Sequence, residues 1–369
     1  MGPEEEPGVA GPQGPQRGAL QSAAVLLTVA VGGWLIVVGK AFLVPLVLAA
    51  FMFILVQALD RVWGRITVGG HRLPPIMTTF LSATFLTLVG VSIINLVATN
   101  ASGVAAAAPG YQYRLTDLVN QFETNVLGLE VDPGEADLSD RFLKHLNVAG
   151  LATQLASGVA SAVGNLSLVL VYLFFLLLER PFFERKMARI FNDTGARSDA
   201  LGMLHRIDHD VSVYLGLKSL VSLLTALPAY GIMLWVGLDF AEFWALLIFG
   251  LNFIPNVGSL VATLLPSSIA LVQFNTLRPF VLVALGITSV QLIVANLVEP
   301  NLLGRRLNMS PLLVITALVG WSMLWGLPGA FLCVPMTNIA LLILANVPST
   351  RWIAVLLSRD GDLIEEAAG

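Results

Sequence analysis

The sequence has few charged residues: Asp, Glu, Lys and Arg make up 12% of its 369 positions. A soluble domain carries about 25%. Hydrophobic residues account for 56% of the chain, and the mean hydropathy is +0.81. Several stretches must therefore face lipid rather than water, which excludes an ordinary cytosolic enzyme and a nucleic-acid-binding protein. The net charge of −4 is too small and too dispersed to indicate a polyanionic partner.

Cysteine is nearly absent, since Cys333 is the single one in the chain. One cysteine cannot form an intrachain disulfide, so a secreted module built on disulfides is excluded. The neighbours of Cys333 are apolar, which predicts a buried thiol.

The familiar signatures of catalysis are also missing. The sequence contains neither a Gly-x-Ser-x-Gly turn nor a phosphate-binding P-loop. All four histidines lie outside the apolar stretches, and although His205 and His209 share a helix face, no Glu follows His205 as a metalloprotease requires. A solvated helix face explains this pair better than a metal site. We expect no enzyme activity, no metal and no cofactor.

Long apolar stretches are abundant. A helix that crosses a ~30 Å hydrocarbon core needs roughly 20 such residues. Six stretches meet this requirement, at residues 20–39, 42–59, 76–98, 157–178, 211–236 and 280–298.

Two further apolar stretches, 243–274 and 312–344, are too long for one crossing and too short for two. Each contains Pro and Gly near its middle, at residues 252–259 and 326–329. Because Pro removes a helix donor and Gly frees the backbone, each stretch reads as two half-helices that meet at a tip. The alternative is a pair of Pro and Gly kinks in ordinary membrane helices.

Lys and Arg in the loops indicate the orientation of the spans. Residues 60–75 hold three Arg against one acid, and residues 179–210 hold six Lys or Arg, so both read as cytoplasmic. Residues 109–147 hold three basic residues against seven acids and read as external. The predicted fold is an all-α polytopic membrane protein with six full spans plus two opposed re-entrant helical hairpins that form an inverted repeat. Both termini are then cytoplasmic.

This topology divides the chain into five parts. Residues 1–18 are a disordered cytoplasmic tail, 19–98 carry the first three spans, 99–155 form an extracytoplasmic helical segment, 156–358 form the transport core with both hairpins, and 359–369 form a cytoplasmic tail. An amphipathic external helix is expected from the spacing of Leu115, Leu118, Val119, Phe122 and Val126. Residues 181–210 are expected to form one or two interfacial helices.

Polar residues at membrane depth are the candidate site, because each is costly there unless it is paired or hydrated. The candidates of the solute or ion pathway are Asn252, Pro255, Asn256, Gly258, Ser259, Gln291, Asn296, Gly326, Pro328 and Gly329. The Asn side chains at the first tip can coordinate a solute or cap the half-helix ends, and the two roles are compatible. Lys218 lies about two turns inside its span, where it either snorkels to the interface or forms an ion pair with Glu299.

Four blocks carry a resemblance to a known family. They are Asn252-Phe-Ile-Pro-Asn-Val-Gly-Ser259, Asn296-Leu-Val-Glu-Pro-Asn-Leu-Leu-Gly-Arg-Arg306, Ser310-Pro311, and Leu324-Trp-Gly-Leu-Pro-Gly-Ala330 with Val334-Pro335. In order and spacing they resemble the autoinducer-2 exporter (AI-2E) family of bacterial membrane proteins. One departure is Asn301, which stands where many relatives have Arg.

The resemblance implies a multi-pass transporter of the bacterial inner membrane that exports an autoinducer-2-type signal molecule and forms a homo-oligomer, a pentamer in this family. From the residues alone we expect secondary transport of a small polar solute across the lipid bilayer, with an ion gradient as the energy source and no nucleic acid involved. The alternatives are a Na⁺/H⁺ antiporter and a passive oligomeric channel. An antiporter needs a buried carboxylate, yet the apolar spans and hairpins as placed above contain no Asp or Glu. This favours a neutral or weakly polar cargo.

Overall fold

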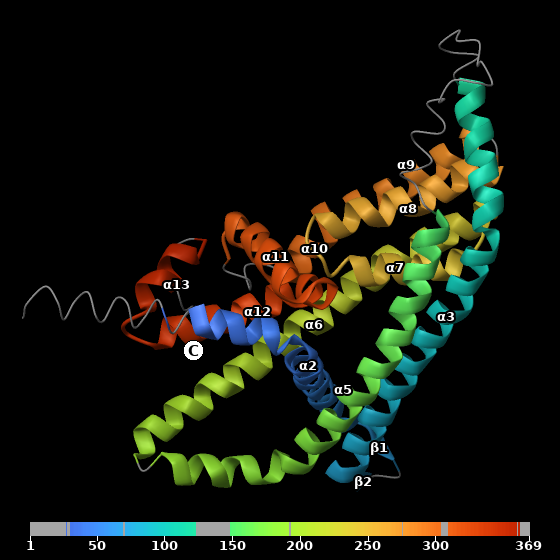
Figure 1. Ribbon diagram of the computed structural model, residues 1–369. Coiled ribbons are helices and arrows are strands. Elements are labelled where there is room, and N and C mark those ends of the chain that lie inside the picture. Colours follow the sequence, from blue (N-terminus) through green and yellow to red (C-terminus); the bar gives the residue numbers. More distant parts are fainter. Residues whose placement is uncertain are drawn as a thin grey trace, which may run out of the picture.

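The computed structural model describes residue 27 and residues 30–68, 71–122, 148–191, 193–274, 276–303, 309–359 and 361. Over these residues the chain is almost entirely helical (Figure 1). The helices are α2 (Lys40–Trp63), α3 (Pro75–Phe122), α5 (Val148–Ile190), α6 (Thr194–Val236), α7 (Ala241–Leu251), α8 (Val257–Phe274), α9 (Leu277–Ile293), the π-helix η2 (Val294–Val298), α10 (Glu299–Leu303), α11 (Pro311–Trp325), α12 (Leu327–Asn346) and α13 (Arg351–Leu357). Two short antiparallel strands, β1 (Thr67–Val68) and β2 (His71–Arg72), lie between α2 and α3.

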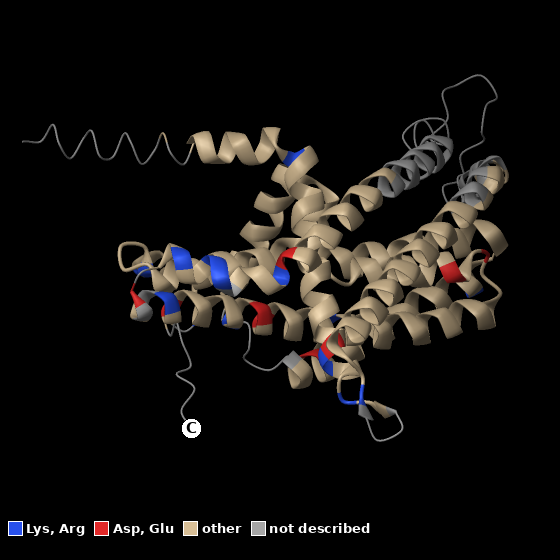
Figure 2. Ribbon diagram, turned by 90° about the horizontal axis from the view of Figure 1, so that it is seen from below, with Lys and Arg blue, Asp and Glu red and all other residues tan. Residues whose placement is uncertain are grey.

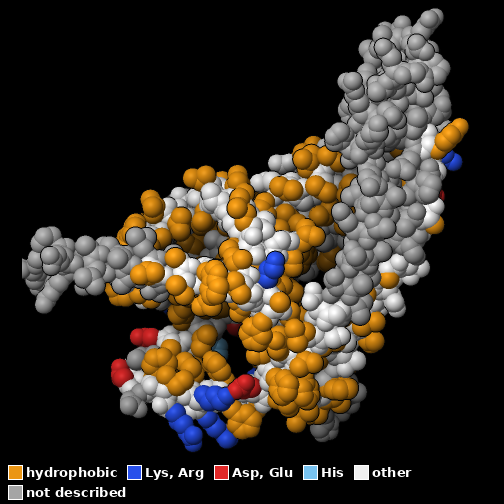
Figure 3. All heavy atoms as spheres, viewed as in Figure 1, with side chains coloured by type: hydrophobic (Ala, Val, Ile, Leu, Met, Phe, Trp, Pro, Cys, Tyr) orange, Lys and Arg blue, Asp and Glu red, His pale blue; other side chains and the backbone are white. Residues whose placement is uncertain are grey.

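Seven helical segments of the described chain are long and apolar enough to cross a membrane. They are Lys40–Trp63, Pro75–Asn100, Gly164–Phe183, Arg197–Val236, Val257–Phe274, Leu277–Leu302 and Leu327–Asn346. Large apolar side chains cover much of the visible face of the molecule (Figure 3). Figure 2 shows long uncharged lengths of helix, with acidic and basic residues gathered near helix ends and connections. The prediction of an all-helical polytopic membrane protein is confirmed at this level.

The N-terminal helical region differs in detail from the prediction. Residues 30–38 are helical and meet α2 through a turn at Gly39, where a Cβ would lie 2.7 Å from the Leu35 carbonyl oxygen. Most of the rest of the predicted span 20–39 lies outside the described residues. The second span ends later than predicted, because helical hydrogen bonding continues to Gly64, whose N–H donates to the Asp60 carbonyl. Asp60 therefore lies in the last turn of α2 and not in a loop.

The external segment is not a separate helix over the part that the structure describes. α3 runs without interruption for 48 residues to Phe122, because the alanine-rich sequence that follows the third predicted span favours continued helix. Residue 126 and the rest of the segment up to residue 147 lie outside the described residues. The helix resumes with α5 at Val148.

The predicted interfacial helices at 181–210 are also extensions of longer helices. α5 continues to Ile190 with Pro181 inside it, and α6 already begins at Thr194. Figure 1 shows α5 bending near its C-terminal end before the chain turns into α6. A proline within a helix removes one backbone hydrogen bond and permits such a bend.

α6 is the central helix of the fold. Its first half, with Val211, Tyr214 and Leu215, packs into an apolar cluster with α11, α12 and Phe253. Its second half, with Ala226 and Met233, packs into another cluster with α7, α8 and α9. A third cluster joins α2 to α5. Both stretches that the sequence predicts as hairpins are thus anchored to the same helix.

Candidate functional site

The first predicted tip is a tight turn between α7 and α8. Asn252 follows the last residue of α7, and Asn256 has a left-handed backbone with φ of 58°. A Cβ at Gly258 would lie 1.8 Å from the carbonyl oxygen of Leu251, so only glycine lets the two arms approach this closely. Ser259 donates its hydroxyl to the Asn256 carbonyl at 2.9 Å. The last α-helical hydrogen bond of this arm runs from the Asn252 N–H to the Ile248 carbonyl, and Pro255, which has no N–H to donate, lies three residues beyond it.

The second predicted tip is built in the same way between α11 and α12. Gly326 joins the two helices with φ of 66°, and Pro328 lies in the first turn of α12, where its missing N–H costs nothing. A Cβ at Gly329 would lie 1.9 Å from the carbonyl oxygen of Trp321. The indole N–H of Trp321 donates to the Thr337 hydroxyl at 3.0 Å and ties the two arms together. Each tip therefore closes on a glycine that touches the backbone of the opposite arm.

The two tips meet through a pair of aromatic rings. Phe253, in the first tip, stacks on Phe331, in α12, with ring centroids 4.5 Å apart and ring planes 26° apart. Phe253 is 4% exposed, and both rings belong to the apolar cluster that includes Tyr214 of α6. Two breaks that lie far apart in the sequence are thus brought into contact.

A polar stripe on α6 faces the first tip. Lys218, Ser222 and Thr225 are spaced i, i+4 and i+7, which places them on one face of the helix. All three are buried, with residue exposures of 8%, 0% and 2%. Asn252 donates its side-chain amide to the hydroxyls of Ser222 at 3.3 Å and Thr225 at 3.4 Å. The Asn252 side chain thus bridges to another helix instead of capping its own.

The polar stripe ends in an ion pair. Lys218 Nζ lies 2.6 Å from Glu299 Oε1, and the two side chains are 10% and 27% exposed. Of the two readings of Lys218, the geometry is that of pairing and not of snorkelling. Glu299 follows the π-helix η2 directly. A π-turn takes in one extra residue and so rotates the following helix by about 100°, which changes the direction in which Glu299 points.

Three polar residues of the last span are not joined to this stripe by any hydrogen bond among the described residues. Asn296 is exposed and donates to the carbonyl of Leu292 on its own helix. Asn301 likewise donates to the carbonyl of Leu297, and Gln291 is half-buried on α9. Local hydrogen bonds of this kind satisfy a polar side chain in apolar surroundings.

Several residues of the site were not selected from the sequence. Ser222, Thr225 and Phe331 were missed, and Phe253 was noted only as part of a motif. The i, i+4, i+7 spacing that follows Lys218 is the signal that identifies the two hydroxyls. No signal in the sequence pairs Phe253 with Phe331. Among the described residues there is no group of three or more His, Cys, Asp or Glu side chains that could hold a metal ion.

The fold and the site together define a class: a helical membrane protein in which two glycine-closed hairpins meet beside a buried polar stripe. A comparison with family models matches residues 24–349 to the AI-2E family transporter model. The chain belongs to this family, and it is a membrane transport protein.

Individual relatives differ in what their names state. The chain is 28% identical over 320 residues to the AI-2 transport protein TqsA of Escherichia coli (strain K12). The alignment covers 86% of this chain and 89% of the relative. It is 34% identical over 206 residues to a Borreliella burgdorferi protein whose name gives transport but no substrate, covering 56% and 57% of the two chains. It is 23% identical over 334 residues to a sodium-lithium/proton antiporter of Halobacillus andaensis, covering 84% and 90%.

Proposed function

We propose that this protein is a secondary transporter that exports a small polar solute across the bacterial inner membrane. The observation that carries the proposal is the meeting of the two tips at Phe253 and Phe331, beside the buried polar stripe of α6. In this arrangement a solute binds between the tips and the stripe, and one hairpin moves against the other to change its access. The polar groups available to it include Asn252, Asn256, Ser259 and the backbone at Gly326.

The proposal includes six full spans and two opposed re-entrant hairpins, with both termini in the cytoplasm. Helix length supports it. α7 has 11 residues and α11 has 15, which at 1.5 Å per residue reach about 17 and 22 Å. Neither of these first arms reaches across a ~30 Å hydrocarbon core, which supports a tip at membrane depth after each of them. The second arms, α8 and α12, are long and apolar enough to cross, so the length argument rests on the first arms alone. Irregular backbone is tolerated at that depth where protein surrounds it, and the Phe253–Phe331 contact supplies such surroundings.

An autoinducer-2-type signal molecule is the proposed cargo. The support comes from the family and from the name of the Escherichia coli relative. The chemistry of the tips agrees, because amide, hydroxyl and backbone groups suit a neutral, oxygen-rich solute. A homo-oligomer, a pentamer by family resemblance, is part of the same proposal.

Na⁺/H⁺ exchange is the second candidate, and two observations favour it. One relative is named as a sodium-lithium/proton antiporter. In addition, the longer α2 places the carboxylate of Asp60 on a candidate span, where it accepts hydrogen bonds from Thr79 and Ser82 at 2.7 and 2.8 Å. The sequence-based argument that the spans hold no carboxylate therefore does not exclude this activity.

Counterflow in proteoliposomes tests the first candidate. Full-length protein is reconstituted with unlabelled autoinducer-2 inside, and entry of a labelled preparation is measured. A carrier gives transient accumulation that depends on the internal solute, whereas a channel gives entry that internal solute does not accelerate. Absence of entry, combined with Na⁺-dependent proton movement reported by an internal pH dye, would overturn the first candidate in favour of the second.

A further inference from the structure

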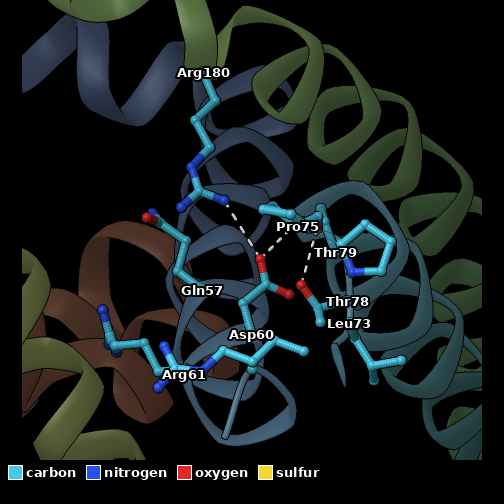
Figure 4. Close-up of a pocket in the computed structure, with 11 residues that line it drawn as sticks. Gln57, Asp60, Arg61, Leu73, Pro75, Thr78, Thr79 and Arg180 are labelled. Carbon is cyan, nitrogen blue, oxygen red and sulfur yellow. Dashed lines mark hydrogen bonds and ion pairs between the residues drawn. The ribbon is translucent and has the colours of Figure 1, made fainter. Parts of the chain in front are cut away.

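A second polar site lies at the junction of α2, α3 and α5. Export through the two tips does not use it, although its Asp60 is the carboxylate that favours the second candidate function. A cavity of about 700 Å³ opens between the last turn of α2, strand β2, the first turn of α3 and Arg180 of α5 (Figure 4). Its charged lining consists of Asp60, Arg61, Arg72 and Arg180. Three arginines and one aspartate thus line the cavity, and among them only Arg180 contacts the aspartate.

The carboxylate of Asp60 is already fully engaged. Its oxygens accept hydrogen bonds from the hydroxyls of Thr79 and Ser82 and an ion-pair contact from Arg180 at 3.3 Å. In Figure 4 the Arg180 side chain reaches across the cavity toward Asp60. Arg180 uses one nitrogen in this contact and is 44% exposed, so most of its five N–H donors remain directed at solvent or a ligand.

The other two arginines leave an excess of positive charge. Arg61 donates to Asp208 at 3.1 Å and to the Ser212 hydroxyl at 2.9 Å, so a second carboxylate offsets its charge. Arg72 is exposed and has no ion pair among the described residues. After both carboxylates are counted, the cavity keeps one unbalanced positive charge together with unused guanidinium donors. Planar guanidinium groups of this kind bind phosphate oxygens in pairs.

Two exposed apolar side chains lie on α3 one residue beyond residues that line the cavity. Ile76 and Phe80, which follow the lining residues Pro75 and Thr79 in α3, are 86% and 72% exposed. The cavity also lies where the candidate spans Lys40–Trp63 and Pro75–Asn100 end and begin, and the ends of membrane spans lie near the headgroups of the bilayer. A ligand that fits this arrangement carries an anionic group and apolar chains together.

We propose that this cavity binds the phosphodiester headgroup of an anionic phospholipid, with its acyl chains lying along Ile76 and Phe80. Arg72 and Arg180 hold the phosphate oxygens, and Asp60 positions Arg180. Basic pockets between membrane helices bind such headgroups, and each basic residue near the surface contributes about 1 kcal/mol.

The test measures lipid binding to full-length protein in detergent by native mass spectrometry. Dioleoylphosphatidylglycerol and dioleoylphosphatidylcholine are titrated separately, and inorganic phosphate is added to the first titration as a competitor. Arg72→Gln removes a guanidinium without leaving a carboxylate unpaired. Arg189→Gln is the matched control, since it removes one exposed positive charge from α5 outside the cavity. Arg180→Lys is a second variant that keeps the charge but loses the forked donors.

The expected result is tighter binding of phosphatidylglycerol than of phosphatidylcholine. Arg72→Gln should weaken the binding of phosphatidylglycerol about fivefold. Arg180→Lys should also weaken this binding, and Arg189→Gln should leave it unchanged. Equal binding of the two lipids, or identical behaviour of Arg72→Gln and Arg189→Gln, would overturn the proposal. Displacement of the lipid by millimolar inorganic phosphate would assign the cavity to free phosphate and overturn the lipid assignment.

Discussion

Lys218 of α6 and Glu299 of α10 form a largely buried ion pair, with 2.6 Å between Nζ and Oε1, although 81 residues separate them in the sequence. The contact ties the central helix to the end of the last predicted span. Attraction between opposite charges is strong where water is scarce, but each charge is then costly without the other.

Reversal of either charge alone is expected to destabilise the protein. Lys218→Glu or Glu299→Lys places two like charges together in a poorly hydrated site, and loss of one partner of a buried pair costs about 3–5 kcal/mol. The double variant with the charges exchanged should recover most of the melting temperature in detergent. Arg278→Gln, at an exposed position of α9, is the control. A double variant no more stable than the singles would show that the pair does not act as a unit.

The two tip glycines are expected to reject even a methyl group. In Gly258→Ala or Gly329→Ala the new Cβ would lie 1.8 or 1.9 Å from a backbone oxygen, and a backbone cannot move aside as a flexible side chain can. We expect a loss of more than about 3 kcal/mol of stability, or no folded protein, as seen by size-exclusion chromatography.

Each tip glycine has a matched control in its own hairpin. Gly250→Ala in α7 and Gly320→Ala in α11 meet no atom within 4 Å. Both control variants should be as stable as the unaltered protein or slightly more stable, because alanine has a higher helix propensity than glycine. If the tip and control variants melt at the same temperature, the close approach of the arms is not a requirement of the fold.

The positions of the tips were predictable, because there Pro and Gly lie near the middle of apolar stretches that are too long for one crossing. Proline alone is a weaker signal, since Pro45, Pro228, Pro266 and Pro335 all stay within helices. The pairing of Lys218 with Glu299 was also open to prediction, since Lys218 is the one charged residue inside the predicted spans and Glu299 directly follows the last of them. The contact of Phe253 with Phe331 could not be predicted, because it depends on how two separate hairpins pack on α6. A single sequence carries no signal of that packing.

Helix ends were the weakest part of the prediction. Hydropathy reports which residues can enter lipid, whereas a helix ends where its hydrogen-bond ladder ends. α2 therefore reaches Trp63 and takes in Asp60, and α3 continues beyond its apolar part to Phe122. Because the sequence analysis placed Asp60 in a loop, it counted no carboxylate on the spans and argued against Na⁺/H⁺ exchange on that ground.

Tyr111 provides a test of pH dependence outside the spans. Burial raises the pKa of Tyr111 from 10.0 to about 12, and the nearby charge of Asp239 adds to the effect. Asp239 accepts a hydrogen bond from the Tyr111 hydroxyl at 3.2 Å. A raised pKa in the folded state means that the stabilisation is complete below pH 10 and is lost as the pH rises toward 12. Melting temperatures should therefore fall across this interval.

Replacement of Tyr111 by Phe isolates its contribution. Tyr111→Phe should be less stable near neutral pH, because Asp239 loses a donor, and should lose stability less steeply between pH 10 and 12 than the unaltered protein. Tyr113→Phe, at a position 79% exposed, is the control and should reproduce the unaltered profile. Identical slopes for both variants would show that Tyr111 ionises as an ordinary exposed tyrosine does.

Cysteine accessibility tests whether the tips line a watery path, as the proposed function requires. The buried Cys333 is replaced by Ala, and single cysteines are placed at Val257 and Leu327, which are 52% and 75% exposed beside the two tips. The tip glycines themselves are unsuitable, because any side chain there meets the opposite arm. A membrane-impermeant maleimide should modify both positions, and autoinducer-2 should slow the reaction. Leu285→Cys, at a position 63% exposed on α9, should stay unmodified because lipid covers it. If Val257→Cys and Leu327→Cys are as unreactive as Leu285→Cys, lipid covers the tips as well and no solute path passes between them.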